Sequence, residues 1–201
     1  MTKLRGYSAA CERNKGPILE RLQPILADCT SVLEIGSGSG QHAVFFAEKM
    51  PHLVWYSSDR TLNHIDIQAR LGEAALANTP SPLALDVMNP EWPALSVDAI
   101  FSANTAHIMS WGAVEKLFAG VGKLLSMDGL FLLYGPFNDN HQYSSDSNRH
   151  FDQHLKQRDP RSGIRDFEAV DQLAQQAGMV LQQDYPMPAN NRLLCWRKTP
   201  S

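Results

Sequence analysis

Short apolar runs alternate with longer amphipathic stretches along most of the chain. Short apolar runs between turn residues are typical of buried strands, and apolar residues spaced three and four apart are typical of helices. The expected strands are residues 31–36, 53–59, 82–87, 97–104, 130–135, 180–185 and 191–198. The expected helices are residues 16–29, 41–50, 63–76, 112–125, 148–158 and 167–178. This order predicts an α/β fold with a seven-stranded, mostly parallel sheet, helices on both faces and a C-terminal antiparallel hairpin.

Length and composition predict one globular domain. The chain has 201 residues, of which 43% are hydrophobic and 19% charged, enough for a sizeable core. We expect a single domain over 1–201, with 1–30 as an N-terminal helix and cap. The polar stretch 136–165 is too long for an ordinary connection and predicts a lid on the substrate side. Asn14 is expected to cap the first helix, and Pro24 to bend or end it.

Charge and cysteine usage narrow the partners and the compartment. The net charge of −3 and the lack of a long Lys/Arg run make nucleic acid an unlikely partner. No apolar run approaches the roughly 18 residues of a membrane span. Cys11, Cys29 and Cys195 are far apart and not in CxxC spacing, which indicates reduced thiols and a cytoplasmic location.

The stretch "VLEIGSGSGQHAVFFAEKM" places Gly36, Gly38 and Gly40 directly after the first expected strand, with Glu34 just ahead of them. A dinucleotide loop needs its third glycine at Gln41, and a phosphate-binding P-loop needs Gly-Lys-Ser/Thr, so both patterns fail. A glycine loop beside an acid suits a bulky cationic molecule such as S-adenosylmethionine, which carries an ammonium and a sulfonium. The alternative, a tight turn without a ligand, is disfavoured here because a turn alone should not need three glycines.

Two further acids close the next two expected strands. Asp59 ends the strand 53–59, where a carboxylate can accept hydrogen bonds from both ribose hydroxyls. Asp86, near the end of strand 82–87, can accept from an adenine amino group while Val87 contributes its backbone. Each acid also has a plainer interpretation, as a solvated strand end for Asp59 and a turn cap for Asp86.

The motifs "VLEIGSGSG", "LVWYSSD", "LALDV" and "DAIFSANTAHI" together resemble those of class I S-adenosylmethionine-dependent methyltransferases. More closely, "SAACERNKGPIL", "GPF" and "DSNRHFDQHLKQRDPRSGIRDFEAV" resemble the domain of unknown function 938 group, whose animal member is called methyltransferase-like protein 26. The resemblance implies a Rossmann-like fold and S-adenosylmethionine as cofactor, with S-adenosylhomocysteine as product, but no particular acceptor. The expected cofactor-binding residues are Asn14, Glu34, Gly36, Ser37, Gly38, Gly40, Asp59, Arg60, Asp86, Val87 and Asn104.

Methyl transfer needs an aligned nucleophile and, where that nucleophile is protonated, a base. The fourth strand leads into "SANTAHIMSW", which lacks the Asn/Asp-Pro-Pro-Tyr/Phe arrangement of amino-nitrogen nucleic-acid methyltransferases. His107 is the candidate general base because histidine titrates near neutrality, and its alternative is a pocket-wall residue. Tyr143 is the second catalytic candidate. The expected substrate-binding residues are Trp111, Ser145, Asn148 and Arg165.

His150 and His154 are spaced four apart, but Phe151 stands where a zinc motif would have glutamate, so no metal is expected. The preferred function is methyl transfer to a small molecule. Methyl transfer to a protein or RNA is the less favoured hypothesis within the same enzyme class. The alternative from another class is a cofactor-binding protein without transferase activity that acts through a partner. A nicotinamide dehydrogenase ranks last because of Gln41. No membrane partner is expected, and a homodimer is left open.

Overall fold

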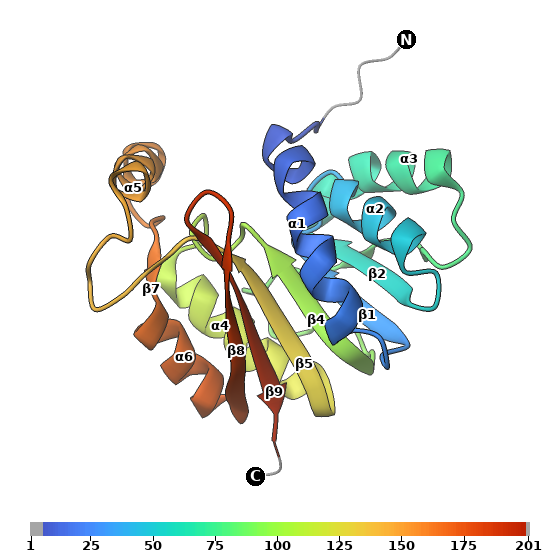
Figure 1. Cartoon of the computed structure of the whole chain (residues 1–201). Helices are drawn as coiled ribbons and strands as arrows, with labels where there is room; N and C mark the ends of the chain where they lie inside the picture. The colour runs from blue at the N-terminus through green and yellow to red at the C-terminus, as the bar shows by residue number, and fades with distance from the viewer. Residues whose placement is uncertain (1–5, 200–201) are drawn as a thin grey trace. The chain divides into compact units, whose positions relative to one another are not determined.

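The computed structural model describes residues 6–199, and the chain divides into two compact units, Met1–Phe101 and Ser102–Ser201. Seven strands form one sheet in the order β3-β2-β1-β4-β5-β9-β8 (Figure 1). The predicted α/β fold, with a mostly parallel sheet that ends in antiparallel strands, is confirmed. The assignment of 1–201 as a single domain stays a prediction, and each unit is described by itself below.

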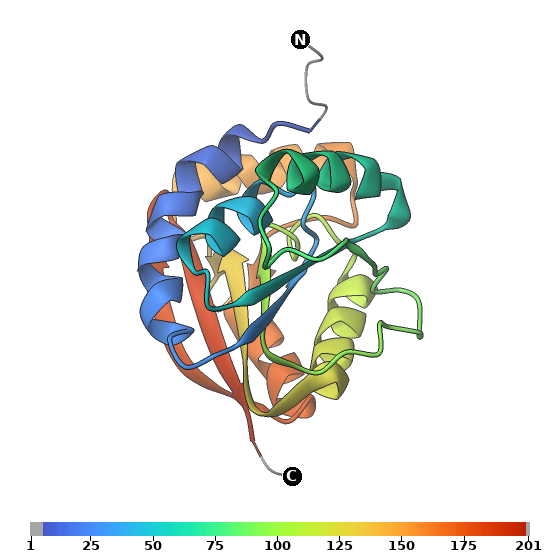
Figure 2. The same ribbon diagram turned by 90° about the vertical axis from the view of Figure 1, so that its right-hand side faces the viewer.

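The first unit supplies the parallel strands. Its elements are α1 (Ala9–Ile25), β1 (Ser31–Ile35), α2 (Gln41–Lys49), β2 (Val54–Asp59), η1 (Thr61–Asn63), α3 (His64–Ala74), β3 (Leu83–Ala84) and the greater part of β4 (Val97–Ala103). β1 pairs in parallel with β2 and β4, so that Val32 lies opposite both Trp55 and Ala99. Helix α2 packs against α1 and α3, as Figure 2 shows. Parallel strands end at one edge, which brings the glycine loop after β1 beside Asp59 at the end of β2.

Aromatic rings fill the core of the first unit beneath that edge. Phe46 of α2 lies 5.3 Å from Trp55 and 5.6 Å from Phe101, measured between ring centroids. His42 stacks on Phe46 at 5.2 Å. All three aromatic residues are fully buried. A polar group that enters this core must therefore find its partners among a few side chains.

The second unit supplies the antiparallel strands. Its elements are α4 (Trp111–Leu124), β5 (Leu125–Gly135), β6 (Phe137–Asn138), α5 (Asp146–Arg158), β7 (Arg165–Asp166), α6 (Phe167–Gln176), β8 (Met179–Met187) and β9 (Asn191–Lys198). β9 pairs antiparallel with both β5 and β8, and β6 pairs with β7 in a separate small sheet. Phe118, Phe131 and Trp196 form its aromatic core. The stretch 136–165 thus has regular structure of its own.

Helix α1 begins earlier than predicted. Ser8 is its N-cap, because the Ser8 hydroxyl accepts the Cys11 N–H at 3.3 Å, and Asn14 therefore lies inside the helix. The expectation that Asn14 caps this helix is wrong. Pro24 does stand in the last turn, as a helix-ending proline should.

Two strands also differ in length from their predicted ranges. β3 stops at Ala84, and the Asp86 carboxylate accepts the Met88 N–H at 3.0 Å in the turn that follows. β5 starts at Leu125, directly after α4, five residues before the expected strand 130–135. Asp128 accommodates this with a left-handed φ of 61° inside the strand. The first difference lies beside a turn capped by an acid, and the second includes a left-handed residue within the strand.

Within residues 6–199, no helix is both long enough and apolar enough to cross a bilayer.

We predict that Gly122→Ala destabilises the protein. A Cβ at Gly122 of α4 would lie 2.7 Å from both the Cβ and the carbonyl oxygen of Ala177, just after α6. The helix-propensity gain of about 1 kcal/mol is then outweighed by an overpacking cost of roughly 1–3 kcal/mol. The matched control is Gly72→Ala in α3, where a Cβ meets nothing within 4 Å and should stabilise. Urea unfolding measures both, and a Gly122→Ala protein as stable as wild type would contradict the packing.

Candidate active site

The glycine loop between β1 and α2 has a left-handed backbone at three positions. The φ angles of Gly36, Gly38 and Gly40 are 78°, 58° and 75°. A Cβ at Gly38 would meet nothing within 4 Å, so backbone strain rather than crowding favours glycine there. The turn itself therefore uses all three glycines, and the expectation that it should not need them is wrong. The glycines alone therefore do not indicate a ligand. Evidence for a ligand site has to come from the side chains around the loop.

Amide groups of the loop are engaged inside the first unit. The N–H groups of Gly36 and Ser37 both donate to the Ser58 carbonyl, at 2.9 and 3.0 Å. The Gly40 N–H donates to the Ser37 carbonyl at 2.8 Å, and the Gly38 N–H to the Asp59 carboxylate at 2.8 Å. A phosphate-binding loop needs such donors free to face the anion. In this loop, these N–H groups are bonded within the unit instead.

Asp59 stands at the end of β2, as predicted, and is bonded on both oxygens. Its Oδ2 accepts from Gly38, and its Oδ1 accepts the Arg60 N–H at 2.7 Å and the Asn63 side-chain amide at 2.8 Å. A carboxylate has about four acceptor positions, so capacity remains for a ligand hydroxyl. Arg60 contributes its backbone here, and its residue is exposed. The ribose-binding role of Asp59 stays a prediction.

Glu34 is buried in β1 beneath the loop, with only 2% of the residue exposed. Its Oε2 accepts hydrogen bonds from the Trp55 indole at 3.1 Å and the Ser37 hydroxyl at 3.0 Å. Burial raises the pKa of Glu34 to about 7; the two hydrogen bonds lower it and the negative charge of Asp59 raises it. Its Oε1 lies 3.9 Å from His42 Nδ1. A buried acid with a raised pKa and neutral donors is a typical feature of functional sites.

His42 belongs to this cluster, although the sequence did not single it out. Its Nε2 is hydrogen-bonded to Asn14 Oδ1 at 2.8 Å, and its residue is 4% exposed. Burial, followed by the charge of Lys15, lowers the pKa of His42 to about 4. The structure thus brings Asn14, His42 and Glu34 together. Polar residues on the inner faces of two helices were the available signal.

Gln41 occupies the position where a dinucleotide loop has its third glycine. Its side-chain oxygen accepts the Ser8 N–H at 2.6 Å and the Ser39 hydroxyl at 3.0 Å, while its amide donates to the Ser8 carbonyl at 3.3 Å. Gly6 also packs on this end of the loop, since a Cβ there would lie 3.0 Å from Ser39 Cβ. Gln41 therefore ties the residues before α1 to the start of α2.

Asp86 does not join the buried cluster. Its residue is exposed, and its carboxylate caps the turn at Met88, which matches the plainer interpretation of its position. The neighbouring Val87 is buried. Their contact with the adenine stays a prediction.

His107, in the second unit, is buried in the turn after β4. Its ring packs edge-on against Phe151 at 5.3 Å between centroids, and its carbonyl accepts the Gly163 N–H at 2.8 Å. Burial, and then the charge of Arg165, lower the pKa of His107 to about 4. The prediction rested on titration near neutrality, whereas this imidazole is uncharged throughout the neutral range. It can accept a proton there, but as a weaker base than expected.

Tyr143 is bound to a buried acid that the sequence analysis did not name. Its hydroxyl donates to Asp152 Oδ2 at 2.7 Å, which raises the pKa of Tyr143. The same carboxylate accepts from Lys156 Nζ at 2.6 Å and from the Ile164 N–H at 2.7 Å. Burial would raise the pKa of Asp152, but these three bonds lower it. Asp152 and Lys156, four apart on one helix, were the signal that could have located this cluster.

The remaining substrate-side candidates hold their own segment together. Ser145 is the N-cap of α5, where its hydroxyl accepts the Asn148 N–H at 3.1 Å. The buried Asn148 side chain donates to Ser144 Oγ at 2.8 Å and to the Asn190 carbonyl at 3.1 Å. These bonds join α5 to the turn between β8 and β9. Their acceptor-binding roles stay predictions.

Arg165 braces the loop that follows β4. Its guanidinium donates to the carbonyls of Ala106 at 3.1 Å and of Met109, and it lies 5.9 Å from the ring centroid of Trp111. Asn104, in the same loop, has a left-handed φ of 58° and donates its N–H to the Tyr134 carbonyl at 2.9 Å. A non-glycine residue held in this conformation is often found at functional sites.

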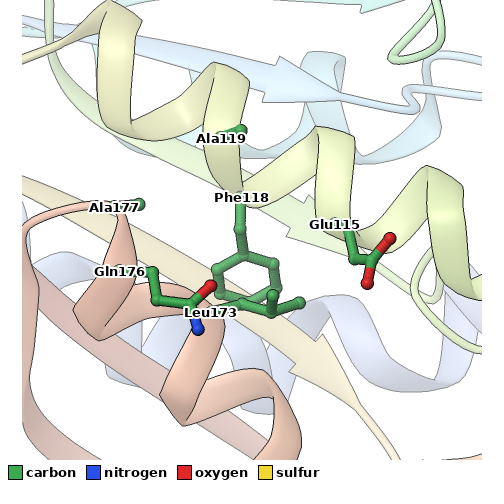
Figure 3. Close-up of a pocket in the computed structure, with 6 residues that line it drawn as sticks. All are labelled: Glu115, Phe118, Ala119, Leu173, Gln176 and Ala177. Atoms are coloured by element: carbon green, nitrogen blue, oxygen red, sulfur yellow. The ribbon is translucent and has the colours of Figure 1, made fainter.

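A separate pocket of about 300 Å³ lies between α4 and α6 (Figure 3). Phe118 and Leu173 form its apolar part, and the polar ends of Glu115 and Gln176 lie around it. None of the predicted site residues lines this pocket. Within the described part of the chain, no cluster of three or more His, Cys, Asp or Glu could hold a metal ion.

One comparison with known proteins shows the family, and the others show the fold. Residues 5–198 match the family described as "Protein of unknown function (DUF938)". An O-methyltransferase family protein from Burkholderia thailandensis matches with a TM-score of 0.83 at 11% identity, over 96% of this chain and 58% of that one. Human N-acetylserotonin methyltransferase, solved in complex with SAM, matches with a TM-score of 0.78 at 15% identity, over 95% of this chain and 53% of that one.

The mitomycin 7-O-methyltransferase MmcR gives a TM-score of 0.80 at 15% identity, over 95% of this chain and 55% of that one. The chain therefore spans a little over half the length of these structures. At such identities the likeness shows a shared fold.

We predict that Glu34→Gln changes how stability depends on pH. With a folded pKa of about 7 against an ordinary 4.5, Glu34 is protonated when folded and ionised when unfolded between these values. Its contribution to stability is therefore present below pH 4.5 and is lost as the pH rises to about 7, by about 3 kcal/mol in all. Glutamine does not titrate, so the variant should lose this decline. Urea unfolding from pH 5 to 8 measures it, and parallel profiles for the two proteins would contradict a buried neutral acid.

Proposed function

We propose that this chain, which belongs to the DUF938 family, is an S-adenosylmethionine-dependent methyltransferase that acts on a small-molecule acceptor. The alternative is a protein that binds S-adenosylmethionine or S-adenosylhomocysteine without transferring a methyl group. The observation that carries the proposal is the pair of carboxyl groups at the glycine loop. Asp59 lies against the loop backbone, and Glu34 is buried below it.

The charges and donors at the loop favour this cofactor over a dinucleotide. Among the described residues, no Lys or Arg forms an ion pair with Glu34, so a cationic ligand would meet an acid whose hydrogen-bond donors are neutral. The loop amides of Gly36, Ser37, Gly38 and Gly40 are already bonded within the unit and leave little for a pyrophosphate. A ligand with an ammonium, a sulfonium and a ribose, but no phosphate, fits both facts.

We assign cofactor-binding roles to residues of the first unit and acceptor-binding or catalytic roles to residues of the second. Asp59 would accept a hydrogen bond from a ribose hydroxyl, and Glu34 would stabilise the cationic end. When bound, S-adenosylmethionine supplies an activated methyl group on its sulfonium. In the second unit we propose that neutral His107 takes the acceptor's proton, and that Tyr143, whose raised pKa keeps it protonated, orients the acceptor. Trp111, Ser145, Asn148 and Arg165 are proposed to shape the acceptor site.

Titration calorimetry with S-adenosylmethionine, S-adenosylhomocysteine and NAD tests the cofactor. We expect the first two to bind and NAD not to. Asp59→Ala should weaken S-adenosylmethionine binding by about 1–3 kcal/mol, because the ribose loses a charged acceptor. Glu73→Ala, an exposed acid of α3, is the control and should bind normally.

Because Asp59 also holds Gly38, Asp59→Asn should accompany the alanine variant as a conservative change, with folding checked by circular dichroism. Unchanged affinity in both folded variants would place the ribose elsewhere. Binding of NAD alone would overturn the proposed cofactor. Binding of S-adenosylmethionine with no methylated product from a metabolite extract would favour the alternative without transferase activity.

For His107→Ala we predict a turnover at least about 100-fold lower, with cofactor affinity unchanged, because a positioned base is lost. Since the pKa of His107 is about 4, wild-type turnover at saturating S-adenosylmethionine should fall only as the pH drops toward 4, and not near 6.5. The control is His150→Ala, which removes an exposed histidine of α5. Methyl transfer from labelled S-adenosylmethionine into a metabolite extract measures both. Equal turnover in wild type and His107→Ala would exclude His107 as the base.

A further inference from the structure

Glu34 and His42 face each other inside the first unit, and among the described residues no Lys or Arg forms an ion pair with either side chain. The distance from Glu34 Oε1 to His42 Nδ1 is 3.9 Å, and both residues are almost fully buried. The hydrogen bonds that Glu34 receives from Trp55 and Ser37 both fall on the other carboxyl oxygen, Oε2. Neither of these hydrogen bonds reaches Oε1, the oxygen that faces the imidazole. The protonation of Oε1 therefore depends on His42.

Asn14 decides which nitrogen of His42 carries the hydrogen. The Asn14 oxygen lies 2.8 Å from His42 Nε2, so that nitrogen is the donor. The neutral ring then has a bare acceptor at Nδ1, directed at Glu34. Two facing acceptors repel each other, and one proton between them removes the repulsion. Asn14 thereby makes the ionised form of Glu34 unfavourable in the free protein.

The groups around the pair do not neutralise it. From α1, the Cys11 sulfur lies 4.0 Å from His42 Nδ1, and Lys15 acts on His42 while it pairs with Glu12. From β2, Trp55 donates a neutral hydrogen bond and Asp59 adds a second negative charge. From α2 and β4, the contacts are the rings of Phe46 and Phe101. Within residues 6–199, Glu34 therefore has neutral or acidic neighbours only.

We infer that His42 is a further residue of the cofactor site, and that with Glu34 it holds one proton which the cationic end of the cofactor displaces on binding. The inference rests on the proposed function. The proton leaves the Glu34–His42 pair for the solvent, and the negative charge that remains on Glu34 faces the incoming cation. His42 acts through Glu34, so it is a positioning residue.

The acid–base properties of the pair agree with this geometry. Burial sets the pKa of Glu34 to about 7 and that of His42 to about 4, which puts the proton on Glu34. At pH 6 the free protein should therefore carry nearly the whole proton, and at pH 8 almost none. As the pH is raised toward 7, cofactor affinity should accordingly increase by up to about tenfold per pH unit, and above pH 7 it should level off.

Calorimetric titration with S-adenosylmethionine in two buffers of different ionisation enthalpy counts the protons released. Wild type should release close to one proton at pH 6 and close to none at pH 8. Glu34→Gln should release none at either pH. His52→Gln is the control, because His52 contacts the Leu26 carbonyl away from the pair, and its proton count should match wild type.

Asn14→Leu separates the positioning role from general burial. Without Asn14, the His42 ring can place its hydrogen on Nδ1 and donate it to an ionised Glu34. The pH at which half a proton is released should then fall by about one unit. An unchanged midpoint in a folded Asn14→Leu protein would remove His42 and Asn14 from the inference.

The outcomes separate this inference from the proposed function. Binding of S-adenosylmethionine at pH 6 without proton release would overturn the shared proton and leave the cofactor assignment intact. Failure to bind S-adenosylmethionine at all would overturn the proposed function. The proton can still be tested without ligand, by the infrared carbonyl band of a protonated carboxylic acid at pH 6. If Glu34→Gln does not remove such a band from the wild-type spectrum, the pair does not hold the proton.

Discussion

The left-handed glycine turn after β1 is the constraint from which the first unit is built. It redirects the chain from a buried strand into α2 within a few residues, at backbone angles that side chains with a Cβ rarely adopt. The turn also points its amides at Ser58 and Asp59, so the loop is held by the neighbouring strand β2. The ends of β1 and β2 are thereby fixed to each other, and Glu34 is left beneath the loop.

The position of Glu34 is costly for folding. An acid buried beside Trp55 and His42 must be protonated or must find a cation, and either condition couples the site to its surroundings. A fold selected for stability alone would place an apolar residue there. A desolvated acid retained in a well-packed core is typical of a site built for a ligand.

In the second unit, the long polar segment 136–165 is held by hydrogen bonds to buried side chains. The Asp152 carboxylate accepts hydrogen bonds from Tyr143, Lys156 and the Ile164 N–H. Gly163 passes so close that a Cβ there would lie 2.9 Å from Asp152 Oδ1. Arg165 then fixes the loop of His107 through backbone carbonyls. Polar side chains that the sequence predicts to bind a substrate, such as Asn148 and Arg165, here form hydrogen bonds that stabilise the fold.

The sequence by itself determined the order of strands and helices, the glycine turn and the acid at the end of β2. These features depend on hydrophobic periodicity and local backbone preference, which are written in neighbouring residues. It could not determine that Asn14 pairs with His42, that Gln41 binds the backbone of Ser8, or that Asp152 organises α5. Those contacts join residues far apart in the chain. The raised pKa of Glu34 and the lowered pKa of His107 likewise depend on tertiary structure, because desolvation depends on everything packed around a group.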